Sequence, residues 1–321
     1  MTVAAEADSF PLAGKRIWVA GHRGMVGSAI VRRLQREPCE VLTITRDDLD
    51  LRRQAATEAW IEAMEPDAIV VAAARVGGIL ANASHPAGFL YDNLAIATNL
   101  IEGARRAGVA KLLFLGSSCM YPREAPQPIA EDALLAGPLE PTNEPYAVAK
   151  IAGLKLAESY HREHGCRFVS VVPPNLYGPG DNYQPESAHV LAALIRRFHL
   201  AKEDRLERVA IWGSGTPTRE FLHVDDLADA CVLLLRRYEA APFINVGTGK
   251  EISIRALAGL VAELTGYRGE IDLDPSRPDG TPRKVMDVSR IHAMGWRPRI
   301  GLREGIAATY RDWLDLAHAD L

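Results

Sequence analysis

Short apolar runs alternate with stretches of helical periodicity along the first half of the chain. The apolar runs predict strands at residues 15–20, 41–44, 68–74, 111–115 and 167–172, and the helical patterns lie at residues 28–34, 57–64, 95–107 and 145–164. An alternation of this kind is typical of a parallel sheet with helices on both faces. The sequence therefore predicts an α/β fold built on a doubly wound parallel sheet.

The pattern becomes less regular after residue 172. Clusters of proline and glycine divide the second half into shorter elements at residues 173–174, 178–180, 213–217 and 275–282. We expect a flexible tail over residues 1–14 and a first domain over 15–172. Residues 173–321 should form mainly a smaller, mixed α/β lobe, with some segments returning to the first domain. The cleft between two such lobes is the expected position of an active site.

The composition excludes several classes of protein. The 321 residues are 48% hydrophobic and 24% charged, as in ordinary globular proteins. The net charge of -4, from 37 basic and 41 acidic residues, gives no electrostatic reason to expect nucleic acid or an anionic membrane as a partner. No segment approaches the roughly 18 to 20 apolar residues of a membrane span, and the N-terminal residues do not resemble a secretory signal.

The four cysteines are widely scattered, at Cys39, Cys119, Cys166 and Cys231. They form neither a CxxC motif nor a zinc-like cluster, so we expect no disulfide framework and no metal site. Free thiols of this kind are typical of a reducing compartment, and we expect a cytoplasmic protein.

A glycine motif joins the first predicted strand to the first predicted helix. Its three glycines have GxxGxxG spacing, which permits a tight turn and lets backbone N–H groups approach a pyrophosphate. A strand-to-helix turn without a ligand is the alternative, but the surrounding βαβ pattern favours a Rossmann-type dinucleotide site. We expect cofactor contacts along the whole turn, at Gly21, His22, Arg23, Gly24, Met25, Val26 and Gly27.

The region after the second predicted strand bears on the choice of cofactor. NAD-selective sites usually place an acidic residue there for the ribose 2′-hydroxyl, whereas this chain has Arg46. Arg46 and Arg23 together suit a 2′-phosphate, which favours NADP(H). Asp47 and Asp48 follow directly and weaken the inference, and a solvated Arg46 on a surface loop is the alternative.

Tyr146 and Lys150 form a YxxxK motif within a predicted helix. Residues four apart share one helix face, so the ammonium can lower the pKa of the phenol and make Tyr146 a proton donor. Ser117 and Ser118 follow the strand at 111–115, at the sheet edge where open α/β folds bind ligands. A capping serine and a surface Tyr–Lys pair are the alternatives without chemistry.

In this order, the glycine turn, the serine after a strand and the YxxxK motif resemble the extended type of the short-chain dehydrogenase/reductase family. The resemblance implies that Ser117 and Tyr146 polarise a carbonyl group, and that Lys150 also holds the nicotinamide ribose while NADPH delivers hydride. Ser117 is preferred over Ser118 because the serine of the family stands four residues before an aromatic residue, here Tyr121. The resemblance implies further cofactor contacts at Leu115, Gly116, Ser118, Pro173, Pro174, Asn175, Leu176 and His189.

Further segments narrow the resemblance to the nucleotide-sugar epimerase-reductases of this family. They are GHRGMVGSAI, LGSSCMYP, EPTNEPYAVAKIAG, PPNLYGPGDN, WGSGTPTREFLHVDDLA, INVGTG and PDGTPRK, and the similarity spans about residues 15–315. The resemblance implies NADPH-dependent epimerisation of GDP-4-keto-6-deoxy-D-mannose at C3 and C5, followed by reduction at C4 to GDP-L-fucose. It also implies a homodimer built from helices of the first domain. Residues 15–172 would then bind NADP, and the second lobe would bind the GDP-sugar.

The same resemblance assigns Cys119 as the base and His189 as the acid of the epimerisation. Deprotonation at C3 or C5 places negative charge on the C4 oxygen, so Ser117 and Tyr146 would stabilise the enolates as well as the reduction. Residues i and i+2 of an extended segment project to the same side, so we expect Cys119 to face the substrate beside Ser117. A buried structural cysteine and a structural histidine are the alternatives.

Substrate contacts rest on the resemblance alone. It points to Asn175, Arg197, Trp212, Arg219 and Asp279, with the arginines meeting the diphosphate. Trp212 in a core and Arg197 on a solvated helix face are the alternatives.

Three other functions share much of this pattern. They are an NAD-retaining nucleotide-sugar 4-epimerase, a 4,6-dehydratase and a non-catalytic protein that senses the cofactor. Dehydratases of the family carry an acidic pair after the serine strand, whereas Cys119 and Met120 occupy that place here. The presence of both Tyr146 and Lys150 disfavours a non-catalytic protein.

Overall fold

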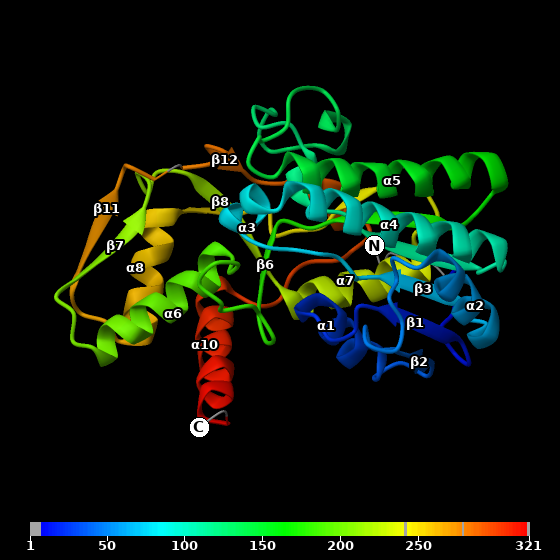
Figure 1. Cartoon of the computed structure of the whole chain (residues 1–321), viewed down its shortest axis with the longest axis horizontal. Coiled ribbons are helices and arrows are strands. Elements are labelled where there is room, and N and C mark those ends of the chain that lie inside the picture. The colour runs from blue at the N-terminus through cyan, green and yellow to red at the C-terminus, as the bar shows by residue number, and fades with distance from the viewer. Residues whose placement is uncertain (1–7, 241–242, 278, 320–321) are drawn as a thin grey trace, which may run out of the picture.

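Six parallel strands form the large sheet of the molecule (Figure 1). The computed structural model describes residues 8–240, 243–277 and 279–319. Along the sheet the order is β2-β1-β3-β4-β5-β9, with bounds β1 (Arg16–Ala20), β2 (Glu40–Leu42), β3 (Ala68–Val71), β4 (Lys111–Leu115), β5 (Phe168–Val172) and β9 (Ile244–Asn245). All five pairings are parallel. The predicted doubly wound α/β fold is confirmed.

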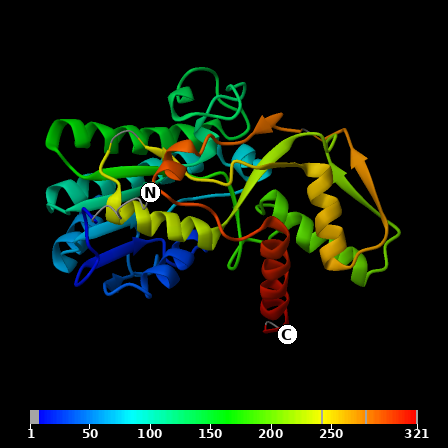
Figure 2. The same cartoon turned by 180° about the vertical axis from the view of Figure 1, so that it is seen from behind.

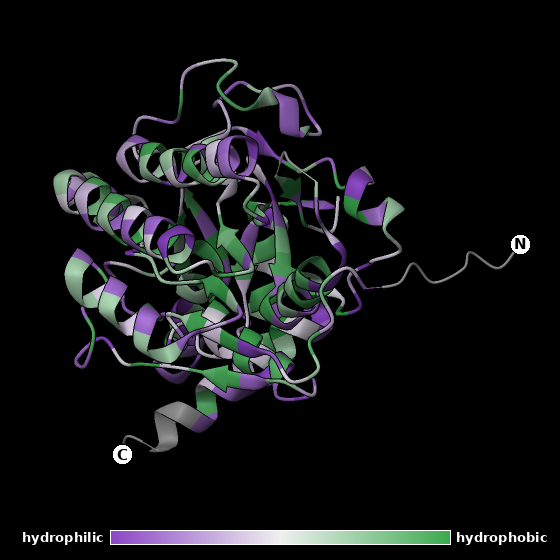
Figure 3. Cartoon of the chain, turned by 90° about the vertical axis from the view of Figure 1, so that its right-hand side faces the viewer, coloured by the Kyte–Doolittle hydropathy of each residue, from purple (hydrophilic) through white to green (hydrophobic). Residues whose placement is uncertain are grey.

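Helices cover both faces of this sheet. On one face α1 (Met25–Leu34) packs against α7 (Val224–Arg237), as Figure 2 shows from behind. On the other face α2 (Gln54–Met64), α4 (Pro86–Arg106) and α5 (Glu144–His164) lie side by side. Apart from the edge strand β2, the strands between them are buried along nearly their whole length, and they appear as the hydrophobic centre of Figure 3. Apolar runs without alternation are expected for strands that are covered on both faces.

The second half of the chain forms smaller sheets and its own core. β8 (Thr218–His223) pairs with β10 (Glu251–Ser253), β12 (Arg283–Lys284) and β6 (Asn175–Tyr177), and β7 (Arg208–Trp212) pairs with β11 (Glu270–Asp274). Their apolar faces pack with α6 (Val190–Glu203), α8 (Ile254–Thr265) and α10 (Leu302–Ala319). Short helices complete the structure: α3 (Ile79–Ser84), α9 (Ser289–Ala293) and the 3-10 turns η1 (Ser118–Met120) and η2 (Glu131–Ala133).

Two segments of the second half lie with the large sheet. The strand β9 adds beside β5, and α7 packs on α1. At the other end of the chain, Phe10 and Leu12 are buried in the same core, and Asp8 pairs with Arg236 and Arg237. Phe10, Leu12 and Asp8 therefore anchor residues 8–12, which differs from the flexible tail expected over residues 1–14. Residues 1–7 lie outside the described residues.

The helix α4 starts nine residues before the predicted helix at 95–107. Pro86 occupies its first position, where a missing N–H costs nothing. The polar residues Asp92 and Asn93 interrupt the apolar pattern, yet both are buried. Asp92 pairs with arginines, and the Asn93 amide bonds to backbone groups of Arg75 and Phe89. Apart from Phe89, which lies in α4 itself, these partners come from elsewhere in the chain, so local periodicity does not show them.

No helix in the described ranges is both long enough and apolar enough to cross a membrane. Groups of three or more potential metal-ligating side chains are likewise absent from the described part of the chain.

Candidate active site

Two glycines of the turn between β1 and α1 have no room for a side chain. Gly21 has a φ of +89°, and a Cβ atom there would lie 2.6 Å from the backbone nitrogen of Ala73. A Cβ on Gly27 would lie 2.1 Å from the Gly21 carbonyl oxygen. Gly24 caps α1 in an extended conformation. The turn therefore holds β1, β3 and the start of α1 close together and leaves the first N–H groups of α1 open, which fits a dinucleotide pyrophosphate.

The two arginines expected at the 2′-phosphate are both exposed. Arg23 lies in the glycine turn and Arg46 follows β2, the strand next to β1 in the sheet. The neighbouring acid Asp48 accepts a hydrogen bond from the Thr45 hydroxyl at 2.5 Å. Neither Asp47 nor Asp48 forms an ion pair with Arg46 in the described part of the chain, so neither acid competes with a ligand for the guanidinium group.

The serine and the cysteine lie in a tight turn at the carboxyl end of β4. The turn is the 3-10 element η1, with Ser117 as its N-cap, and the backbone N–H of Cys119 donates to Ser117 Oγ at 3.3 Å. The expectation of an extended segment that aligns residues i and i+2 is therefore wrong. Cys119 is brought near Ser117 by the turn itself, because a 3-10 turn folds the chain back within three residues.

Tyr146 and Lys150 lie in the first two turns of α5. Burial raises the pKa of Tyr146 above its usual value, and a hydrogen bond with the Ser117 side chain opposes the shift. Lys150 Nζ lies 5.9 Å from the centre of the Tyr146 ring and donates to the Leu115 carbonyl oxygen at 2.8 Å. Burial lowers the pKa of Lys150 to about 8. The Ser117 hydroxyl thus contacts the phenol, as expected for a proton donor beside a carbonyl site. The expected lowering of the Tyr146 pKa by Lys150 is wrong, because burial of the phenol raises it.

Two polar side chains contact the Cys119 thiol. The side-chain amide of Asn143, the N-cap residue of α5, donates to Cys119 Sγ at 3.3 Å. The ammonium of Lys284 donates to the same sulfur at 3.8 Å. Neither residue was predicted. Asn143 lies within the quoted segment EPTNEPYAVAKIAG and Lys284 ends PDGTPRK, but only the fold shows which of their side chains reach the thiol.

His189 is the N-cap residue of α6 and is exposed to solvent. The protein packed around its ring, together with the positive charge of Lys284, lowers the pKa of the imidazole. The preceding segment contacts the loop after β3, where the Gly78 N–H donates to the Ser187 carbonyl at 3.0 Å. Lys284 therefore lies near both His189 and Cys119, the two residues to which the resemblance assigns proton transfer.

The five expected substrate residues all lie in the second half. Arg197, on α6, donates to the Ala210 carbonyl in β7, and burial lowers the pKa of its guanidinium. Arg219 donates to the Thr218 and Asp279 carbonyls, and Trp212 is 38% exposed beneath Arg277. Four of the five, all except Asn175, thus gather around β7, β8 and the loop that contains Asp279.

Two of these side chains have structural roles. The Asp279 carboxylate accepts from the Ser214 N–H at 2.8 Å and from its hydroxyl at 2.9 Å, which fixes the turn after β7. The Asn175 amide donates to the Glu220 carbonyl at 2.9 Å, which joins β6 to β8. A ligand contact of either residue would add to these hydrogen bonds.

The remaining cofactor positions lie around the ends of β4 and β5. The Gly116 N–H donates to Val171, and the Ser118 N–H donates to the Pro173 carbonyl at 3.0 Å. Leu115, Ser118 and Pro174 are buried, whereas Leu176 in β6 is half-buried. These contacts bring the two strand ends together beside Lys150.

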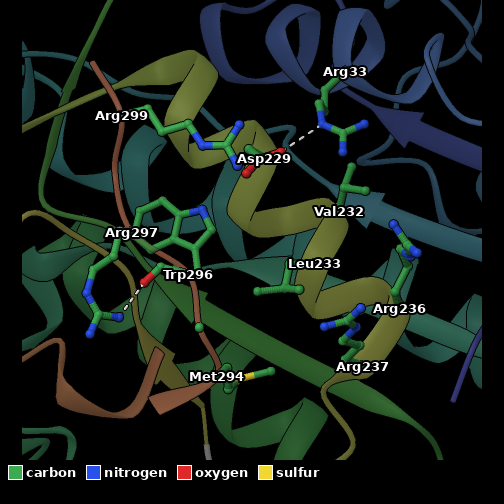
Figure 4. Close-up of a pocket in the computed structure, with 11 residues that line it drawn as sticks. Arg33, Asp229, Val232, Leu233, Arg236, Arg237, Met294, Trp296, Arg297 and Arg299 are labelled. Carbon is green, nitrogen blue, oxygen red and sulfur yellow. Dashed lines mark hydrogen bonds and ion pairs between the residues drawn. The ribbon is translucent and has the colours of Figure 1, made fainter. Parts of the chain in front are cut away.

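A separate cavity of about 390 Å³ lies between α1, α7 and residues 294–299 (Figure 4). It contains none of the predicted catalytic residues. Its arginines are largely compensated, because Arg33 pairs with Asp229 at 2.9 Å and Arg237 pairs with Asp8 at 3.0 Å. Arg297 donates to backbone carbonyls. We therefore assign this cavity to the packing of α7 and not to the active site.

The fold and the geometry of this site define a nucleotide-binding oxidoreductase scaffold, and the sequence comparison gives its family. Over residues 17–247 the chain matches the NAD dependent epimerase/dehydratase family, and it belongs to that family.

Particular relatives are closer still. The chain is 54% identical to a GDP-L-fucose synthase of Sinorhizobium fredii over 303 residues, which covers 94% of this chain and 96% of the relative. It is 53% identical to GDP-L-fucose synthase 1 of Arabidopsis thaliana, with 97% of both chains covered. The crystal structure of a GDP-L-fucose synthetase from Naegleria fowleri bound to NADP superimposes with a TM-score of 0.88 at 25% identity, covering 98% of each chain.

Proposed function

We propose that this protein is an NADPH-dependent enzyme that epimerises GDP-4-keto-6-deoxy-D-mannose at C3 and C5 and reduces C4 to give GDP-L-fucose. The observation that carries the proposal is the position of the Cys119 thiol. It lies in the 3-10 turn that Ser117 caps, at the site that also holds Tyr146 and Lys150. A carbonyl site alone supports reduction, and the added thiol supplies the base that epimerisation requires. The similarity to GDP-L-fucose synthases over nearly the whole chain supports the same substrate.

The reduction uses the donors at the ends of β4 and α5. Ser117 and Tyr146 hydrogen-bond the C4 oxygen, and Tyr146 gives its proton to that oxygen as the carbonyl becomes an alcohol. Lys150 lies close to the phenol, so its charge stabilises the phenolate that remains. NADPH supplies the hydride to C4 when it is bound.

The epimerisations use the same carbonyl. Cys119 removes the proton from C3 or C5, and the electron pair moves onto the C4 oxygen that Ser117 and Tyr146 hold. His189 returns a proton to the opposite face of the carbon. One set of donors thus stabilises charge on one oxygen in all three steps, as an oxyanion site does.

The cofactor proposal rests on the glycine turn and the two exposed arginines. Gly21, Gly24 and Gly27 leave the backbone N–H groups at the start of α1 accessible to a pyrophosphate. Arg23 and Arg46 then bind the 2′-phosphate, which distinguishes NADP from NAD. We place GDP against Arg197, Trp212 and Arg219, because burial of both guanidinium groups strengthens their attraction to a diphosphate.

We also propose that the protein functions as a homodimer in the cytoplasm. The apolar side chains Tyr91 and Val148 are 67% and 40% exposed on the neighbouring helices α4 and α5. A thiol that acts as a base must stay reduced, which agrees with a reducing compartment.

A turnover assay with the purified protein tests the function. The protein is incubated with GDP-4-keto-6-deoxy-D-mannose and NADPH in deuterated buffer, and products are identified by NMR. We expect NADPH consumption and GDP-L-fucose that carries deuterium at C3 and C5. An absence of NADPH consumption would contradict the proposal.

The variant Cys119→Ser separates the two chemistries. Because serine is a far weaker base than a thiolate at neutral pH, deuterium incorporation should fall about 10²- to 10⁴-fold while some reduction at C4 without inversion persists. Cys166→Ser is the matched control, since that thiol lies at the far end of α5 in the loop before β5. GDP-L-fucose formation by Cys119→Ser at the wild-type rate would refute the assignment of the base.

A further inference from the structure

One cation from the second half reaches the thiol, and the mechanism above does not use it. Lys284 Nζ lies 3.8 Å from Cys119 Sγ. Within the described residues, Lys284 forms no ion pair with a carboxylate, whereas its neighbour Arg283 pairs with Glu251 at 2.7 Å. The charge of Lys284 is therefore not cancelled by an acidic side chain.

The backbone around Lys284 is held by a strand pairing and by two side-chain hydrogen bonds. The strand β12 pairs with β8, in the register that places Lys284 beside Arg219. The Val285 N–H donates to Gln127 Oε1 at 3.0 Å, and the Met286 N–H donates to Glu220 Oε2 at 2.7 Å. Glu220 is fully buried and also accepts from the Gly249 N–H at 2.9 Å. Such anchoring holds the base of the lysine side chain in place before any ligand binds.

The other groups that face Cys119 are donors or cations. Asn143, from α5, donates its amide N–H, and the positive charge of Arg219, from β8, interacts with the thiol. Ser117 and Tyr146 contribute neutral hydroxyl groups. Two acids act on Arg219, and both have other partners: Glu140 is paired with Arg123 at 3.3 Å, and the Asp279 carboxylate accepts from the Ser214 N–H at 2.8 Å. The balance of charge around the sulfur is positive, and a positive field favours the thiolate.

We propose that Lys284 is a positioning residue that keeps Cys119 ionised, so that the thiolate is ready to take the proton from C3 or C5. The inference rests on the proposed function. In the step itself, the C–H bond breaks, the proton forms an S–H bond, and the electron pair passes to the C4 oxygen. Lys284 loses no proton. Burial, together with the charge of Lys284, also lowers the pKa of the His189 imidazole.

Alkylation of the thiol tests the proposal without any substrate. Iodoacetamide reacts with thiolates, so the rate at Cys119, followed against pH by mass spectrometry of its peptide, reports the ionised fraction. Cys39 and Cys166 serve as internal references, because burial raises the pKa of each. We expect Cys119 to react at lower pH than either reference.

In Lys284→Met, the midpoint of the Cys119 profile should move up by about one to two pH units, a 10- to 100-fold loss of thiolate near neutral pH. Lys284→Arg should restore most of the profile, since it returns the charge. Arg283→Met is the matched control on the same strand and should leave the profile unchanged. An unchanged midpoint in Lys284→Met, or no restoration by Lys284→Arg, would overturn the proposal.

Turnover gives an independent reading. Lys284→Met should lower kcat for deuterium exchange at C3 and C5 with little change in KM, and the loss should shrink as pH rises. A loss that stays constant with pH would contradict the role in ionisation. If wild-type protein does not turn over the GDP-sugar while the alkylation profiles behave as expected, the proposed function fails and the coupling of Lys284 to Cys119 stands.

Discussion

Lys150 is a charge held almost entirely away from water. Its side chain is 5% exposed, and its ammonium donates to the Leu115 carbonyl. Burial lowers its pKa from 10.5 to about 8 in the folded chain. The folded chain therefore binds this proton less tightly than the unfolded chain does, so charged Lys150 destabilises the fold at neutral pH. That cost falls as pH rises from about 8 toward 10.5.

Replacing Lys150 with methionine separates stability from activity. At pH 7 the variant should gain thermal stability relative to wild type, and this difference should decline by on the order of 3 kcal/mol as pH approaches 10.5. NADPH consumption should fall at least about 100-fold, because Tyr146 loses its cation. Thermal melts at several pH values and the turnover assay measure both. Lys155→Met, at a half-buried position on the same helix, is the control. A stability difference that does not vary with pH would refute the prediction.

At the scale of the element, replacing glycine with alanine should have different effects in two helices, α1 and α8. Gly27→Ala places a Cβ atom against the Gly21 carbonyl oxygen, so the start of α1 must move. NADPH affinity should fall at least about 100-fold, because the N–H groups no longer meet the pyrophosphate. Gly259→Ala, in α8, meets nothing within 4 Å and should be neutral or stabilise by up to about 1 kcal/mol. Cofactor titration measures the NADPH affinity of Gly27→Ala, and thermal melts measure the stability of Gly259→Ala. Normal NADPH binding by Gly27→Ala would contradict the prediction for the glycine turn.

The elements of the large sheet could be predicted because their signals are local. β4 lies at the predicted residues, 111–115, because a buried strand is a short apolar run between turns. The helix α5 begins one residue before the predicted start, because its apolar residues recur with helical spacing. The start of α4 could not be predicted in this way, since Asp92 and Asn93 are buried by partners distant in sequence.

The residues of the site also differ in whether their signals are local in the sequence. Ser117, Tyr146 and Lys150 occur in recognisable spacings, so the sequence predicts them together. The environment of Cys119 depends on Lys284, which lies 165 residues further along the chain, and no spacing connects the two. The 3-10 turn at η1 was also missed, because three residues are too few to show a period.

At the scale of the whole molecule, the exposed apolar residues of α4 and α5 bear on assembly. If these helices form a dimer interface, a charge at Tyr91 or Val148 would be buried without a partner. Tyr91→Glu and Val148→Glu should each shift the protein from dimer toward monomer, as measured by sedimentation velocity. Leu206→Glu, which is 50% exposed in the second half, is the control and should leave the assembly unchanged. A wild-type monomer, or dimers in both variants, would refute the proposed interface.

The position of β9 at the end of the large sheet has a consequence for synthesis on the ribosome. β5 is complete at Val172, but its outer neighbour is supplied only by Ile244–Asn245, roughly 70 residues later. At about 5 to 20 residues per second, the nascent sheet exposes an unpaired, largely apolar edge for several seconds. During that interval this strand is the segment of the large sheet that most needs protection by a chaperone.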